Sequence, residues 1–228
     1  RMAHAHFAMA MVHVARGDLG AAHEVLRQGL SAPGGQGPGL ARFPANGLSW
    51  LDGVIQLALG DTAAARDAFQ TELVQKGSRL FANEYAVDAL EGLGAVRLLE
   101  GEAPRAIDAF EQALSRLTDR PSSLIGLAVA ARAQGDRAGA DTAIGRARQA
   151  IAQLRQAGRA VDAAMAEASL AAATGDRDGA CATLARMLAD APPGYAGWSI
   201  PVEPLLAPLR GAPAFRPVLR RLQARASA

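Results

Sequence analysis

A pattern that recurs five times along the chain restricts its fold more than any other feature. Each copy has a turn glycine, an alanine five residues later and a large apolar residue nine residues later. Seven residues before the glycine, the side chain is never larger than a methyl group. The turn glycines are Gly17, Gly60, Gly101, Gly135 and Gly175. The alanines are Ala22, Ala65, Ala106, Ala140 and Ala180, and the large residues are Leu26, Phe69, Phe110, Ile144 and Leu184.

This pattern predicts a pair of helices in every copy, joined at the glycine. Glycine lacks a Cβ atom, so it adopts the left-handed dihedrals that end a helix, and an aspartate after it caps the next one. Such aspartates are Asp18, Asp61, Asp136 and Asp176. The small position on the first helix then receives the large side chain of the second, which lets the helices cross closely. Because one hairpin cannot bury its own apolar face, the hairpins are expected to stack.

The third copy is the most complete, and its key residues are Leu90, Leu93, Gly94, Arg97, Gly101, Ala106 and Phe110. In this arrangement it resembles the tetratricopeptide repeat (TPR). The resemblance covers about residues 3–192. It implies an all-α fold, a right-handed superhelical stack of about five TPR-like hairpins with a C-terminal capping segment. We expect a repeat array over residues 1–190 and a proline-rich cap over residues 191–228.

The cap begins where the repeats stop, after Pro192 and Pro193. Residues 203–215 resemble the segment that follows TPR arrays in bacterial signalling proteins and transcriptional regulators, with Glu203 and Ala212 in place of its two acidic residues. We expect this segment to cover the open end of the last hairpin with Trp198, Leu205, Leu206, Leu209, Phe215 and Leu219. The arginines after it predict a solvated basic cap helix, with an acidic partner or nucleic acid as the alternatives.

In the TPR family, the first helices line a concave groove that holds an extended or helical partner segment. The resemblance implies groove residues at the positions ten and six before each turn glycine. The candidates for partner binding are Phe7, Met11, Trp50, Val54, Glu91, Ile125, Val129 and Met165. For Phe7 and Trp50, packing beneath the loop that follows the first repeat is the alternative.

The implied function is a non-enzymatic scaffold for protein–protein interaction, which binds a peptide or a partner domain in this groove. The alternative is a C-terminal regulatory or ligand-sensing region of a multidomain bacterial signalling protein or transcriptional regulator. What precedes Arg1 in the full protein would separate the two, because the chain does not open on a methionine.

Composition argues against several other classes of protein. The net charge of +2 is too small to predict nucleic-acid binding by itself. No apolar run reaches the 18 residues of a membrane span, and no signal peptide is recognisable. Cys181 is the only cysteine, so an intrachain disulfide is impossible, and we expect a reducing, cytoplasmic location.

Isolated motifs do not support catalysis or a cofactor. All four histidines lie in the first repeat, at spacings that do not bring zinc ligands together. Residues 31–39 are glycine-rich but lack the Lys-Ser or Lys-Thr of a phosphate-binding loop. No nucleophile stands beside a base and no acid–base pair is recognisable. We therefore expect no metal, no cofactor and no enzymatic activity.

The first helix, predicted at about residues 4–16, is apolar almost all round. A terminal repeat normally has a polar outer face. We therefore expect an upstream domain, an upstream helix or a second copy of the chain to cover it. Further along, Pro121 predicts a helix start, and apolar spacing extends one helix to near Gln156, before Gly158.

Overall fold

The computed structural model describes residues 3–31, 47–74 and 82–227. Every regular element within these ranges is a helix, so the all-α prediction is confirmed for the described part of the chain. The glycine-rich stretch after Ser31, and residues 75–81, lie outside the described residues.

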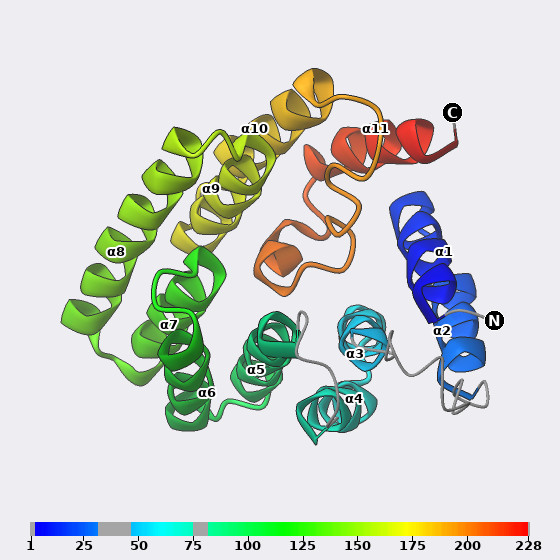
Figure 1. Cartoon of the computed structure of the whole chain (residues 1–228). Helices are drawn as coiled ribbons and strands as arrows, with labels where there is room; N and C mark the ends of the chain where they lie inside the picture. The colour runs from blue at the N-terminus through cyan, green and yellow to red at the C-terminus, as the bar shows by residue number, and fades with distance from the viewer. Residues whose placement is uncertain (1–2, 32–46, 75–81, 228) are drawn as a thin grey trace.

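The described helices form five consecutive hairpins, as the repeated pattern predicts (Figure 1). In chain order they are α1 (Ala3–Arg16) with α2 (Leu19–Ser31), α3 (Leu48–Leu59) with α4 (Thr62–Val74), α5 (Ala82–Leu99) with α6 (Ala103–Arg116), α7 (Pro121–Gln134) with α8 (Arg137–Gln156), and α9 (Ala160–Thr174) with α10 (Arg177–Asp190). The second helix of each hairpin packs against the first helix of the next. Pro121 begins α7 and α8 ends at Gln156, as predicted.

The turn glycines have the conformation that the pattern requires. All five have φ between +75° and +93°, in the left-handed region that an L side chain enters only with strain. All four aspartates that follow turn glycines accept a backbone N–H three residues on, as in Asp136 with Gly139 at 2.8 Å and Asp176 with Gly179 at 2.9 Å. Each therefore satisfies a free N–H group at the start of a second helix.

The helices of a hairpin cross where the sequence places its small residues. The five repeat alanines are fully buried. A Cβ atom on Gly53 would lie 2.5 Å from the ring of Phe69, and one on Gly94 would lie 2.6 Å from the ring of Phe110. The predicted fit of a large side chain on the second helix against a small position on the first is confirmed at these two crossings.

The hairpins are arranged in a ring, and the C-terminal segment, residues 191–214, lies inside it (Figure 1). This segment contains a 3-10 helix, η1 (Pro204–Leu209), which contacts α3, α5, α7 and α9. After it, α11 (Phe215–Ser227) packs against both α10 and α1. The chain therefore joins its first and last hairpins through its own C-terminal helix.

This arrangement corrects part of the expectation for the cap. Helix α11 does cover α10, and Leu206, Leu209 and Phe215 share a core cluster with Leu184 and Leu188 of that helix. Trp198 packs against this cluster too, but it also contacts Phe7 and Trp50 in the first two hairpins, and Leu205 packs against the core cluster that includes Ile125 of α7. The physical reason is that the inner faces of the first helices carry apolar side chains, among them Met11 and Val54, against which Trp198 is partly buried.

Part of the apolar surface of α1 is covered by the chain's own C-terminal helix, α11. Arg16 donates from Nε to the carbonyl of Ala226 at 3.0 Å, and Ala15 is buried in one cluster with Val218 and Leu222 of α11. Met9 remains 51% exposed. An upstream domain or a second copy of the chain stays a prediction for that remaining face.

Candidate functional site

The first helices of the hairpins provide the inner wall, which we define as the faces of α1, α3, α5, α7 and α9 that meet the C-terminal segment. The eight predicted groove residues all lie on these helices. The segment that occupies this face belongs to the chain itself.

An aromatic cluster joins the N-terminal part of the inner wall to the C-terminal segment. The rings of Phe7, Trp50 and Trp198 lie 6.4 Å apart, centroid to centroid, in each of their three pairs. Tyr85 of α5 completes the cluster, 5.8 Å from Trp50. Aromatic pairs at such spacings add stability beyond the burial of their area. Phe7 and Trp50 thus contact the C-terminal segment, and their role in binding a partner stays a prediction.

The other predicted residues are distributed along the wall. Met11 and Val54 belong to the core cluster that includes Trp198. Ile125 is fully buried and shares a cluster with Leu205. Met165 packs in the cluster of Leu206 and Leu209. Val54, Val129 and Glu91 line a cavity, so the structure brings part of the predicted set together around it.

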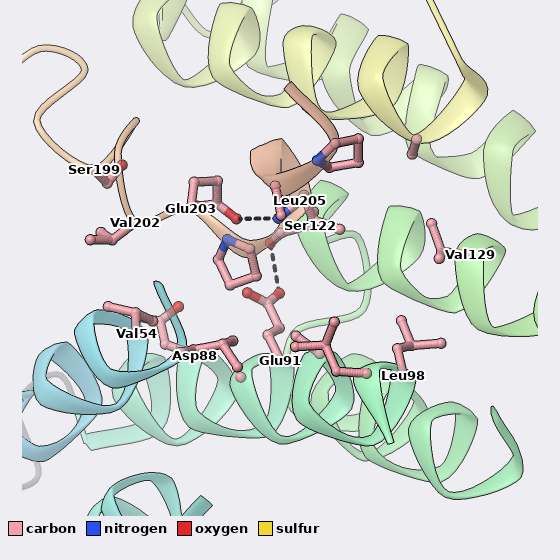
Figure 2. A pocket seen from close by; sticks show the side chains of 18 of the residues that line it. Val54, Asp88, Glu91, Leu98, Ser122, Val129, Ser199, Val202, Glu203 and Leu205 are labelled. Carbon is pink, nitrogen blue, oxygen red and sulfur yellow. Dashed lines mark hydrogen bonds between the residues drawn. The ribbon is translucent and has the colours of Figure 1, made fainter. Parts of the chain in front are cut away.

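The cavity has a volume of about 360 Å³ and lies between the inner wall and the C-terminal segment (Figure 2). Helices α3, α5 and α7 line one side, and residues 198–210 line the other. Its walls are largely apolar, with Leu98, Val129 and Phe110 among them. A volume of this order and a mostly apolar lining with few polar groups are typical of sites for small molecules.

A cluster of charged side chains faces this cavity from three elements. Asp88 and Glu91, one helical turn apart on α5, share a face of the helix and both contact Arg120, which precedes α7. Arg120 Nε lies 3.3 Å from Glu91 Oε1. Ser122 donates its hydroxyl to the same oxygen at 2.6 Å. Glu203 enters from the C-terminal segment (Figure 2).

Burial makes the ionised forms of two of these carboxyl groups costly. It raises the pKa of Asp88 to about 7, although the Arg120 guanidinium opposes the shift. Burial, followed by repulsion from Glu91, raises the pKa of Glu203 to about 7. Among the described residues, the only hydrogen bond that the Glu203 carboxylate accepts comes from the Leu205 N–H at 3.4 Å. The charges of Arg120 and Arg210 oppose this pKa shift in part, but Glu203 has no ion pair within 4.0 Å in the part of the chain that the structure describes.

Sequence reasoning missed Asp88, Arg120 and Glu203 as site residues. Their contacts join α5, the start of α7 and the C-terminal segment, and no local spacing predicts that meeting. The available signal was Glu91, the single charged residue among the eight groove positions. A charge on an apolar inner face requires a partner nearby.

His6 and His23 have structural partners. His6 is buried, with Nδ1 lying 3.1 Å from the carbonyl oxygen of Val25, and His23 Nδ1 lies 2.6 Å from Asp52 Oδ1. Within residues 3–31, 47–74 and 82–227, no group of three or more metal-ligating side chains is close enough to hold a metal ion. Cys181 is buried on α10, and burial raises the pKa of its thiol.

None of the described helices has the length and apolar character needed to cross a membrane. No protein-family model matches the chain, and no curated protein matches it. The functional conclusions therefore depend on the geometry of the inner wall and its cavity.

Proposed function

We propose that this chain is a non-enzymatic binding module of the TPR type. In this proposal the five hairpins form a right-handed superhelical stack, and the inner wall is the recognition surface for a peptide or a partner domain. The equivalent turn glycines and the buried alanine columns support the TPR assignment, because they repeat in a common phase along the described chain.

The observation on which this proposal depends is the occupant of the inner wall. The C-terminal segment contributes a 3-10 helix and turns rich in proline, and it buries Leu206, Leu209 and Ile200 against the array. A wall that accepts such a segment from its own chain has the apolar pockets to accept a similar one from a partner. A partner that binds here competes with the C-terminal segment.

Peptide binding to the full chain tests this competition. The probe is a fluorescent peptide with the sequence of residues 196–212, measured by anisotropy. Trp198→Ala weakens the attachment of the chain's own segment, so we expect the peptide to bind this variant more tightly than the unmodified chain. A scrambled peptide serves as the control. Absence of binding to both chains, or equal binding of the scrambled peptide, would contradict the proposal.

The cavity favours a second candidate function, a regulatory or ligand-sensing region of a larger signalling protein or transcriptional regulator. The C-terminal segment does not fill the inner face completely, and the space that remains suits a small molecule. The resemblance of residues 203–215 to the segment after bacterial TPR arrays supports the same role. A single buried cysteine is in keeping with a cytoplasmic location, which we also propose.

A further inference from the structure

We propose that the cavity binds a small organic cation, an amine whose ammonium group lies beside Glu203 and whose apolar body lies along the inner wall. This inference rests on the ligand-sensing function and names the chemical class of its ligand.

The charge balance of the cavity favours a cation. Three carboxylates, Asp88, Glu91 and Glu203, line it together with two arginines, Arg120 and Arg210. Arg120 contacts both Asp88 and Glu91, which leaves Glu203 without an ion pair within 4.0 Å among the described residues. A buried carboxylate gains most from a cationic partner that also donates hydrogen bonds.

The arginines are poorly placed to hold an anion instead. The guanidinium of Arg120 already meets Asp88, Glu91 and the hydroxyl of Ser122. Arg210 is exposed, its Nη2 donates to the carbonyl of Pro201 at 3.4 Å, and its charge already interacts with Glu203. An anionic ligand would also lie beside Asp88, Glu91 and Glu203, and each of these carboxyl groups that is ionised would repel it.

The rest of the lining suits an apolar body with a positive end. Leu98 and Val129 lie at one end of the cavity in Figure 2, away from Glu203, and offer aliphatic contact. Trp50 and Trp198 also line the cavity. Indole faces attract an organic cation through their quadrupole, in addition to apolar contact. The lining therefore offers a carboxyl group to an ammonium end and apolar side chains to the body of an alkyl or aryl amine.

Such a ligand would contact both the array and the C-terminal segment. Leu98 and Val129 belong to α5 and α7, whereas Trp198 and Glu203 belong to the segment. A molecule that binds only when both sides are in place stabilises the folded, segment-bound state by mass action. Binding is therefore expected to raise the midpoint of thermal unfolding.

Three probes of equal chain length test the inference on the full chain: n-hexylammonium, n-hexanol and n-hexanoate. Calorimetry gives the affinity, and thermal unfolding gives the midpoint. We expect hexylammonium to bind and to raise the midpoint, and hexanoate to do neither. Glu203→Gln keeps an oxygen for the Leu205 N–H but removes the charge, so we expect it to weaken hexylammonium binding about tenfold or more. Glu111→Gln, an exposed site on α6, is the matched control and should change nothing.

A second variant keeps the test decisive if Glu203→Gln perturbs the fold. Val129→Phe fills the apolar end of the cavity and should abolish hexylammonium binding, with helicity checked by circular dichroism. Binding of hexylammonium that survives both variants lies elsewhere and overturns the inference. Equal binding of hexanol or hexanoate overturns the cationic class but leaves ligand sensing intact. If none of the three probes binds, both are overturned.

Discussion

The packing of Phe110 between two glycines gives the sharpest prediction about stability. Phe110 is 2% exposed, and its ring lies against Gly94 of α5 and Gly126 of α7. Truncation to alanine removes a buried ring that packs against both glycines, which costs about 3–5 kcal/mol in protein cores. We expect the upper half of that range, because neither glycine has a side chain that can move into the void.

Urea unfolding followed by circular dichroism measures this free energy, and the slope of the transition shows whether the array still unfolds as one unit. Leu59→Ala is the control, since Leu59 is 54% exposed at the end of α3. A loss below about 1 kcal/mol for Phe110→Ala would be that of an ordinary surface change and would refute the assigned packing.

The same site offers a compensating change. In the unmodified chain, Gly94→Ala places a Cβ atom 2.6 Å from the Phe110 ring, and such overpacking costs about 1–3 kcal/mol against a helix-propensity gain of about 1 kcal/mol. In the Phe110→Ala background the clash is absent, so the added methyl group should stabilise. Additive effects of the two changes would show that the two residues do not touch.

The remaining predictions concern backbone, caps and pH, and the first is that Gly175→Ala, at φ +93°, destabilises by about 1–2 kcal/mol in thermal unfolding. Gly145→Ala, at a helical position with nothing near its Cβ, should instead stabilise, and equal effects at both sites would refute the turn assignment. Asp136→Ala should lower the free energy of unfolding by about 1 kcal/mol, because the Gly139 N–H loses its hydrogen-bond acceptor. Asp141→Ala, at an exposed site within α8 that caps no helix end, should leave that free energy unchanged. Because the pKa values of Asp88 and Glu203 are raised to about 7, the folded state binds more protons than the unfolded state between about pH 4 and 7. The free energy of unfolding should therefore fall as the pH rises through that window, and an identical slope in Glu203→Gln would contradict the burial of this carboxyl group.

The repeated hairpins could be predicted from sequence because each depends on residues close together in the chain. A turn glycine, the following aspartate and the alanine five residues on all act within one hairpin, and the structure has them in those roles. Pro121 and Gln156 mark helix ends for equally local reasons. Local chemistry is therefore enough to place the turns between paired helices and these two helix ends.

The site could be predicted only in part because it depends on contacts between distant residues. The positions ten and six before each turn glycine include Trp50, Val54, Glu91 and Val129, and these four residues line the cavity. The repeat pattern does not predict that the segment carrying Trp198 and Glu203 folds back onto the same face, because no local spacing determines the path of a proline-rich segment. The closure of the ring by α11 likewise depends on a contact between the two ends of the chain.

The contact between Trp198 of the C-terminal segment and Trp50 changes the expected role of Trp50. From sequence, Trp50 is a candidate groove residue, with packing beneath the loop after the first repeat as the alternative. In the structure its ring contacts Phe7, Tyr85 and Trp198, so truncation removes buried aromatic contacts as well as a binding surface. Binding and stability are therefore coupled at this position.

The central claim is that the chain's own C-terminal segment lies on the inner wall, and a nuclear Overhauser effect between the two indole rings tests it most directly. Trp50 and Trp198 are the only tryptophans, so with selective labelling any cross-peak between two tryptophans must join this pair. Their rings meet edge to face with centroids 6.4 Å apart. We expect a cross-peak that disappears in Trp198→Phe. Its absence from the unmodified chain, with Trp198 resonances typical of an exposed indole, would contradict the account.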